Sequence, residues 1–313
     1  MSVRLMNRVG NSGPLDENHA MATRKSFDAN AKPQRRAPPP AGLAPLRLAF
    51  GTLGRIAPGL MARFAYRLWF RTRRFPLSRR ERPVIDRAER HTVLHEGLPL
   101  AVYSWGRGPT VLLVHGWHGS AANFVGFVDP LLAAGMRVLA FDQPAHGATP
   151  GERTNLYEIA AALNAVVGTH GPVEAAITHS FGAPCTLMAI RQGLSIRRVV
   201  CISPPAEVET LLTAFAETLN LPSQVLIRFR WLLERDFGQD IWDRLSPSHV
   251  VRDLDLPALI IHDRDDRAML FEEGEALARA WRGARFHGTS GLGHNRILSD
   301  TAVIARAVDF LGR

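Results

Sequence analysis

Short apolar runs alternate with helix-like segments from residue 91 onward. After a predicted β-hairpin around Gly97, six runs have the composition of buried strands: 111–116, 136–142, 173–180, 196–203, 257–263 and 284–290. The segments between them show the three-to-four-residue spacing of helices: 119–134, 154–168, 181–193, 271–283 and 300–311, with Asp300 placed to cap the last. Short buried strands that alternate with helices favour an α/β fold with a mostly parallel central sheet and helices on both faces.

Residues 205–254 interrupt this alternation, because they show two helical patterns and no strand-like run. A helical insertion between two strands of a parallel sheet lies at the carboxyl edge of the sheet, where the active sites of open α/β folds are found. We therefore predict a small helical cap over a site, the alternative being an ordinary extra helical layer. The core of the fold then consists of residues 91–204 and 255–313.

The first 90 residues lie outside this pattern. Residues 1–42 are polar and contain proline and arginine, and they have too few apolar side chains to offset the entropy of ordering, so we expect a disordered tail. The sequence leaves open whether translation starts at Met1 or Met21. Residues 43–90 predict a basic amphipathic helical extension, and Pro58 suits a first helical turn. Two stripes repeat there at helical spacing: apolar Leu53, Ile56, Leu60, Phe64 and Leu68, and basic Arg63, Arg67, Arg71 and Arg74.

The formal net charge of +9 is unevenly distributed. Residues 1–90 hold 19 basic and 6 acidic side chains, a net +13, whereas residues 91–313 hold 19 and 23, a net −4. Two roles are therefore possible for the extension. It could dock on its own protein with the arginines outward, or it could contact an anionic membrane peripherally. A basic tail without a recognition motif does not predict specific nucleic-acid binding. The oligomeric state stays open.

The composition is that of an ordinary globular protein, with 46% hydrophobic and 21% charged residues. No apolar run reaches the roughly 18 residues of a membrane span, and the N-terminus lacks the apolar stretch of a secretory signal. Cys185 and Cys201 lie in apolar runs, which favours buried thiols over a disulfide. We therefore expect a cytoplasmic protein that contacts the membrane at most peripherally.

The segment Thr178–Gly182 (THSFG) lies between a predicted strand and a predicted helix. It matches the G-x-S-x-G pattern of a nucleophile elbow in four of five positions, with Thr178 in place of the first glycine. Small residues are needed there because the strand reverses sharply into the helix while the serine holds a strained backbone conformation. Ser180 is therefore a candidate nucleophile.

An earlier loop at the same sheet edge supplies a partner for this serine. Its residues 114–117 (VHGW) end a predicted strand, so the backbone amides of Trp117 and Phe181 are candidates for an oxyanion hole. We interpret His115 as bracing the loop. His115 and His118 have the spacing of metal ligands, but no third ligand cluster accompanies them, so we expect no metal.

Candidate acids and a candidate base follow later in the chain. Asp263, Asp265 and Asp266 come just after a predicted strand, and His294 lies in a glycine-flanked loop before the final helix. A serine hydroxyl becomes nucleophilic when a neighbouring imidazole accepts its proton, and a carboxylate must fix the tautomer of that imidazole. The residues alone leave the choice among the three aspartates open.

From about His91 onward the chain resembles the α/β-hydrolase superfamily, in its cofactor-free, small-capped branch of serine esterases and lipases. The matching segments are LLVHGWHGS, FDQPAHG, ITHSFGA, LIIHDRDD and GLGH. The resemblance implies Ser180 as nucleophile, His294 as general base and Asp266 as acid, because the acid of the family usually ends such an Asp-Asp pair; Asp263 and Asp265 remain alternatives. Thr178 and Ala145 stand where the family has glycine, which bears on the substrate more than on the fold.

Together these features predict a serine hydrolase that cleaves a carboxylic ester, or a related acyl bond, through an acyl-enzyme and without a cofactor. The apolar cap side chains Leu211, Phe215 and Phe229 are expected to contact a small-molecule acyl substrate, their alternative role being to pack the cap onto the core. Ester, thioester and amide substrates share this machinery. The alternative function is a membrane-surface scaffold, or an acyltransferase, with an α/β-hydrolase core.

Overall fold

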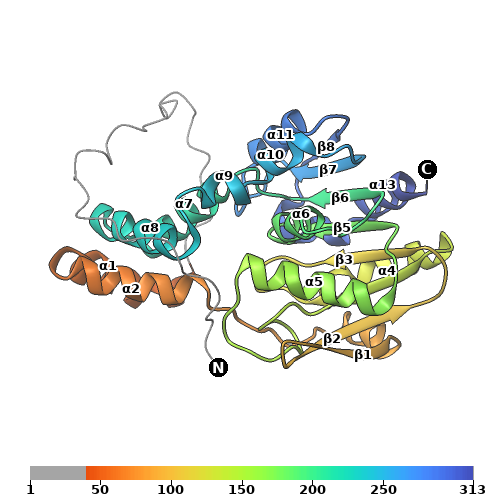
Figure 1. Ribbon diagram of the computed structural model, residues 1–313, viewed down its shortest axis with the longest axis horizontal. Coiled ribbons are helices and arrows are strands. Elements are labelled where there is room, and N and C mark those ends of the chain that lie inside the picture. Colours follow the sequence, from red (N-terminus) through yellow and green to blue (C-terminus); the bar gives the residue numbers. More distant parts are fainter. Residues whose placement is uncertain (1–39, 313) are drawn as a thin grey trace. The chain divides into compact units, whose positions relative to one another are not determined.

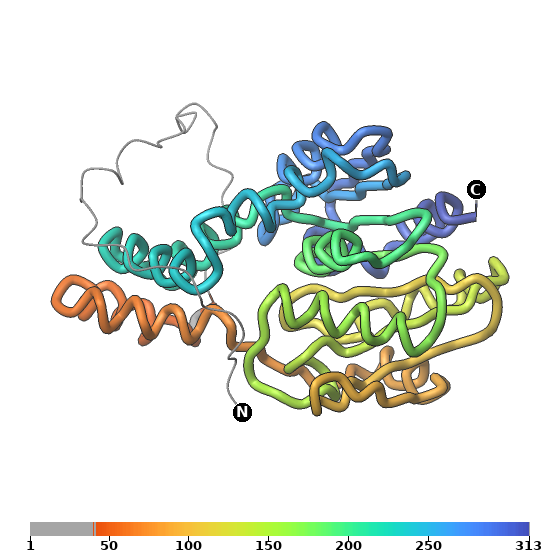
Figure 2. The backbone as a smooth tube through the Cα atoms, viewed as in Figure 1, coloured from red at the N-terminus to blue at the C-terminus, as the bar shows by residue number. Residues whose placement is uncertain are grey.

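A single eight-stranded sheet forms the centre of the protein (Figures 1 and 2), in the order β1-β2-β4-β3-β5-β6-β7-β8. The computed structural model describes residues 40–312, so the predicted disordered tail lies almost wholly outside the described residues. The strands are β1 Glu89–His95, β2 Leu98–Trp105, β3 Thr110–Val114, β4 Arg137–Phe141, β5 Ala175–His179, β6 Arg198–Ile202, β7 Ala258–Asp263 and β8 Arg285–Thr289. Strand β2 pairs antiparallel with β1 and β4, and every pairing from β4 to β8 is parallel. The hairpin and all six predicted strands are confirmed.

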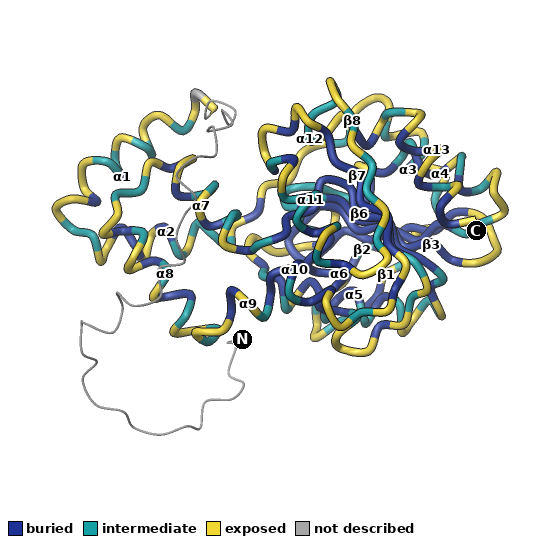
Figure 3. The backbone as a smooth tube through the Cα atoms, turned by 90° about the horizontal axis from the view of Figure 1, so that it is seen from above, coloured by how far each residue is buried: buried dark blue, intermediate teal, exposed yellow. Residues whose placement is uncertain are grey.

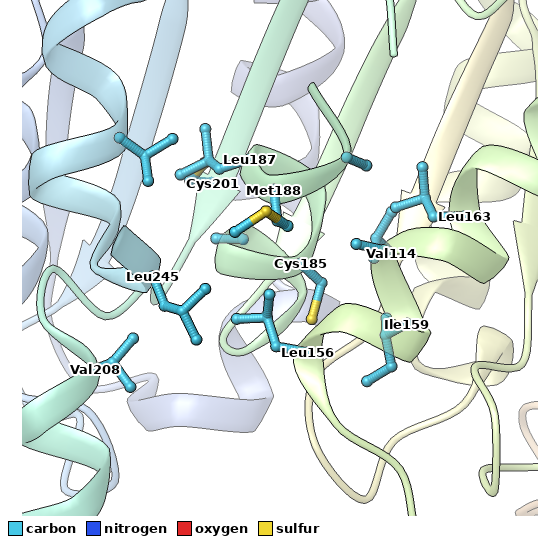
Figure 4. Close-up of a cluster of buried hydrophobic side chains, with 14 of the residues drawn as sticks. Val114, Leu156, Ile159, Leu163, Cys185, Leu187, Met188, Cys201, Val208 and Leu245 are labelled. Atoms are coloured by element: carbon cyan, nitrogen blue, oxygen red, sulfur yellow. The ribbon is translucent and has the colours of Figure 1, made fainter. Parts of the chain in front are cut away.

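Each face of the sheet carries its own core, because successive side chains of a strand point to opposite sides. On β3, Leu112 and Val114 belong to one buried cluster with helices α5 (Leu156–His170), α6 (Gly182–Arg191) and α11 (Phe271–Ala280), part of which Figure 4 shows. Val111 and Leu113 belong to a second cluster with α3 (Arg82–Asp86), α4 (Val125–Ala133) and α13 (Thr301–Leu311). The predicted α/β fold with helices on both faces is therefore confirmed.

The chain between β6 and β7 is helical, as predicted. It forms α7 Val208–Leu219, α8 Ser223–Phe237, α9 Ile241–Leu245, α10 Pro247–Val250 and a 3-10 turn at Val251–Asp253. Helix α10 packs back onto α6 and α11 beside the sheet. The shorter elements of the loops are the 3-10 turns Ala41–Leu43, Ala121–Phe124 and Ile297–Ser299, and α12 Gly293–Arg296. Within residues 40–312, no helix has both the length and the hydropathy of a membrane span.

The predicted amphipathic helix of the extension is two helices, α1 Ala44–Ile56 and α2 Pro58–Trp69. They separate at Ala57, because Pro58 has no amide proton and restricts the residue before it. Helix α2 packs along α8, and α1 contacts α2, α7 and α8. We call α1, α2, α7, α8 and α9 together the helical module.

The buried face of α1 and α2 is not the predicted apolar stripe. Their buried side chains are Phe50, Met61, Ala62 and Ala65. Of the predicted stripe, Leu53, Ile56, Leu60 and Phe64 are exposed, and Leu68 alone packs against the core. Figure 3 shows exposed positions along both helices. Small residues on one side of α2 allow close packing against α8, which decides the orientation of the helix.

Candidate active site

Ser180 lies at the sharp turn between β5 and α6. Its φ is +51°, in the left-handed region that side chains other than glycine rarely adopt. Close packing behind the turn requires Gly182, because a Cβ at that position would lie 2.4 Å from the carbonyl oxygen of Val114. Thr178 fits in place of the expected glycine: it is buried, and its Oγ1 donates to the carbonyl oxygen of Val200 at 3.3 Å. The segment therefore has the strained geometry of a nucleophile elbow.

The loops after β7 and β8 bring Asp266 to His294. Asp266 Oδ2 lies 2.7 Å from His294 Nδ1, and Asp266 Oδ1 accepts hydrogen bonds from the amides of Ala268 and Met269, each at 2.9 Å. Burial by itself would raise the pKa of this carboxyl, but the hydrogen bonds from His262 and His294 more than offset it, so the pKa of Asp266 lies well below its usual value. Asp266 is therefore ionised and accepts the Nδ1 proton of His294, which leaves Nε2 free to act as a base.

The other two aspartates hold the loop that carries His294. Asp263 Oδ1 accepts a hydrogen bond from the amide of Gly293 at 2.9 Å, and Asp265 Oδ2 accepts one from the amide of Gly291 at 2.7 Å. Among the described contacts, neither carboxylate reaches the ring of His294. Of the three candidates, the geometry therefore brings one alone to the imidazole.

His179 connects the elbow with the His294 loop. Its Nε2 donates to the carbonyl oxygen of His294 at 2.9 Å, and the two ring centroids are 4.7 Å apart. Burial lowers the pKa of His179 to about 3, so its ring is neutral. Within residues 40–312, Ser180 Oγ makes no hydrogen bond to the His294 ring, and such serine–histidine pairs often tighten only when substrate binds.

Two backbone amides beside the elbow are free to bind an anion. The amides of Trp117 and Phe181 donate to no acceptor among the described residues. Their rings pack edge to face, with centroids 5.3 Å apart, which joins the β3 loop to the elbow. Unpaired donors at the edge of a sheet are suited to hold a developing oxyanion.

The loop after β3 is braced by histidines. His115 is fully buried, and its Nε2 accepts the amide of Gln143 at 3.1 Å, which confirms the predicted bracing role. The amide of His118 donates to Nε2 of His146 at 3.1 Å. Burial lowers the pKa of both His115 and His118 to about 4. No group of three or more His, Cys, Asp or Glu side chains in the described part of the chain is arranged to hold a metal ion.

An apolar cavity of about 270 Å³ lies between the helical module and the elbow. Trp117 and Phe181 line it from the sheet edge, and Leu211 and Phe215 line it from α7. Its remaining lining includes Tyr157, Leu233, Phe237, Ile241, Trp242 and Leu245. An acyl chain or an aromatic group placed there would lie next to the two free amides.

One expectation about this cavity needs correction. Phe229 does not line it: the side chain is fully buried, and its ring packs against Trp69 and Phe215 with centroid distances of 5.7 and 5.6 Å. Phe229 therefore supports the wall rather than forming it. The extension also contributes Leu68–Arg71 to the lining. The aromatic residues Trp69 and Phe70 at the end of α2 could have indicated from the sequence that the extension lines a cavity.

A family model matches the larger part of the chain. The model of the alpha/beta hydrolase family matches residues 111–307. The chain belongs to this family. Within this α/β hydrolase, Ala145 adopts a φ of +65° where a glycine was expected, and its carbonyl oxygen accepts a hydrogen bond from Thr72 of the extension at 2.7 Å.

Solved structures of the same fold include enzymes with different substrates. An esterase from Pyrococcus furiosus has a TM-score of 0.60 at 20% identity, covering 77% of this chain and 96% of that chain. Est1E from Butyrivibrio proteoclasticus, solved with ferulic acid bound, has a TM-score of 0.54 at 18% identity, covering 70% and 96%. A meta-cleavage product hydrolase from Pseudomonas fluorescens has a TM-score of 0.53 at 18% identity, covering 70% and 96%. No curated protein matches the sequence. At these identities the structures show the fold alone.

Proposed function

We propose that this α/β hydrolase cleaves a carboxylic ester, with Ser180 as nucleophile, His294 as general base and Asp266 as acid. The observation that carries the proposal is the 2.7 Å contact between Asp266 and His294 at the sheet edge where the strained Ser180 lies. Both cysteines of the chain are free and fully buried, and burial raises the pKa of Cys185 and Cys201, so neither is suited to act as the nucleophile.

The reaction then proceeds in two acyl transfers. Ser180 Oγ attacks the carbonyl carbon while His294 Nε2 takes the hydroxyl proton, and the amides of Trp117 and Phe181 bind the oxyanion. When the tetrahedral intermediate collapses, the C–O bond to the leaving group breaks, and His294 returns the proton to the departing alcohol. A water molecule attacks the acyl-enzyme by the same route, which releases the acid and restores the serine.

The cavity supports an ester with an apolar group of moderate size. Its volume of about 270 Å³ lies near the lower end of pockets that hold small ligands, roughly 300–1,000 Å³. The lining side chains Leu211 and Phe215 offer apolar contact and no charge. We therefore place the acyl chain, or an aromatic ring, between α7 and the Trp117 loop.

The test is the labelling of the protein by a fluorophosphonate probe, together with turnover of nitrophenyl esters. Ser180→Ala is expected to abolish both. Ser203→Ala is a matched control, because Ser203 has the same φ of +51° after the neighbouring strand but is fully buried. Labelling that persists in Ser180→Ala would refute the assignment. A panel of esters, thioesters, amides and alcohol acceptors then separates an esterase from a thioesterase, an amidase or an acyltransferase.

A further inference from the structure

Exposed hydrophobic side chains are concentrated on one part of the helical module. Of the nine large hydrophobic side chains exposed in the described chain, seven belong to α1, α2 and α8, which pack against one another. They are Leu48, Leu53, Ile56, Leu60, Phe64, Ile227 and Trp231, with Ile56 80% exposed. Single exposed apolar residues are ordinary, but such a concentration marks an interaction surface. We call the exposed side of α1, α2 and α8 the module face.

Arginines line a hollow between two of these helices, and three of them have no acidic partner among the described residues. A hollow of about 320 Å³ between α2 and α8 is lined by Arg63, Arg67, Arg153 and Arg235, with Tyr66 and Leu232. Arg63, Arg67 and Arg153 form no ion pair with any described residue. Arg235 is paired with Asp236, which also accepts a hydrogen bond from Tyr66.

The surrounding sequence reinforces this charge, because residues 40–80 contain nine arginines and no acidic residue. Exposed aliphatic and aromatic side chains next to unpaired guanidinium groups are the combination that interfacial helices present to anionic lipids. Guanidinium groups also match phosphate oxygens in geometry and charge.

We propose that the module face docks on an anionic phospholipid bilayer. The arginine hollow takes a lipid phosphate, and Ile56, Leu60, Phe64 and Ile227 enter the boundary between head groups and acyl chains. Charge complementarity favours this occupant over the two nearest alternatives. Residues 1–39 hold 7 basic and 3 acidic side chains, so they would be repelled by the arginines, and a second copy would oppose one basic face to another.

The proposal is tested by co-sedimentation of the full chain with vesicles of phosphatidylcholine, with and without phosphatidylserine. The wild type is expected to bind only the anionic vesicles, and less at high salt. The triple variant Arg63→Gln, Arg67→Gln, Arg153→Gln is expected to lose roughly a hundredfold in affinity, at about fivefold for each arginine near the surface. The variant Ile56→Ser, Leu60→Ser, Ile227→Ser is expected to lose at least about tenfold.

Matched controls remove the same groups elsewhere. Arg107, Arg282 and Arg306 are exposed, so their joint change to Gln removes equal charge, and Leu94→Ser removes an apolar side chain that is 72% exposed on β1. Both controls are expected to bind within about twofold of the wild type. All variants change exposed side chains, and turnover of a soluble ester by each confirms that it is folded.

Several outcomes would overturn the proposal. Two of them are the absence of wild-type binding at low salt and equal binding to uncharged vesicles. A third is an equal loss of binding in the triple variant of the hollow arginines and in the triple variant of the control arginines, which would assign the binding to bulk charge or to residues 1–39. Inorganic phosphate that stabilises the protein against heat without any vesicle binding would assign the hollow to free phosphate. A dimer in solution that Ile56→Ser dissociates, again without vesicle binding, would assign the face to a second copy.

Discussion

Acidification from pH 7 to pH 5 is expected to destabilise this protein strongly, because three buried histidines resist protonation in the folded chain. Burial lowers the pKa of His115 to about 4 and the pKa of His146 and His179 to about 3. In the unfolded chain each would titrate near its ordinary value of about 6.5. The folded state therefore binds fewer protons than the unfolded state below about pH 6.5, and stability falls as the pH falls towards 4.

The magnitude follows from the span of that window. At pH 5 an unfolded histidine lies about 1.5 pH units below its pKa, and each unit corresponds to about 1.4 kcal/mol, so each group costs about 2 kcal/mol. Three such groups amount to about 6 kcal/mol, against a typical total stability of about 5–15 kcal/mol. Asp142 acts in the opposite direction, because burial raises its pKa and the folded chain takes up that proton more readily. Burial also raises the pKa of Glu158, and these two carboxyls offset only part of the loss.

The assay is urea unfolding followed by tryptophan fluorescence at pH 7, 6 and 5. His146→Gln gives the internal comparison, since a Gln side-chain oxygen can accept the His118 amide that Nε2 of His146 accepts at 3.1 Å. This variant is expected to lose about 2 kcal/mol less stability between pH 7 and 5 than the wild type. A wild-type loss below about 2 kcal/mol, or an identical loss in the variant, would show that these histidines are not held neutral by burial.

Three further predictions concern the elbow, the acid and the cavity wall. Gly182→Ala is expected to lower the melting temperature and abolish probe labelling, because the added Cβ would lie 2.4 Å from a backbone oxygen. Gly168→Ala is the control: this glycine has open space around it in α5, so the change is expected to stabilise the protein by about 1 kcal/mol. Equal melting temperatures for the two variants would contradict this prediction. Asp266→Asn is expected to lower kcat by about three to four orders of magnitude with little change in KM, and a KM effect alone would exclude it as the acid. Phe229→Ala is expected to lower the free energy of unfolding by about 3–5 kcal/mol without changing the acyl-chain preference. Phe215→Ala is expected to raise KM for the longer esters. The reverse result would show that Phe229, and not Phe215, lines the cavity.

The sequence pattern could not decide which of the three aspartates contacts His294. Asp263 ends β7 and Asp265 and Asp266 follow it directly, so their positions along the chain cannot separate them. The path of the turn after β7 decides: it aims one carboxylate at His294 and ties the other two to amides of the His294 loop. The acid that binds His294 and the two aspartates that hold its loop are the same residue type, and only their contacts distinguish them.

Local signals along the chain were sufficient to place several parts of this protein. Strand alternation, the Asp300 cap of α13, and the strand–turn–helix at Ser180 each depend on a few neighbouring residues, and each was predicted at its place. Only the tertiary structure decided which side of α1 and α2 is buried, because α8, against which α2 packs, lies more than 150 residues later in the chain. An amphipathic pattern indicates two faces, but the shape of the partner selects the one that packs. Here α8 packs on the small side of α2 and leaves Leu53, Ile56, Leu60 and Phe64 exposed, so the extension presents a surface of its own, while its end at Leu68–Arg71 lines the cavity.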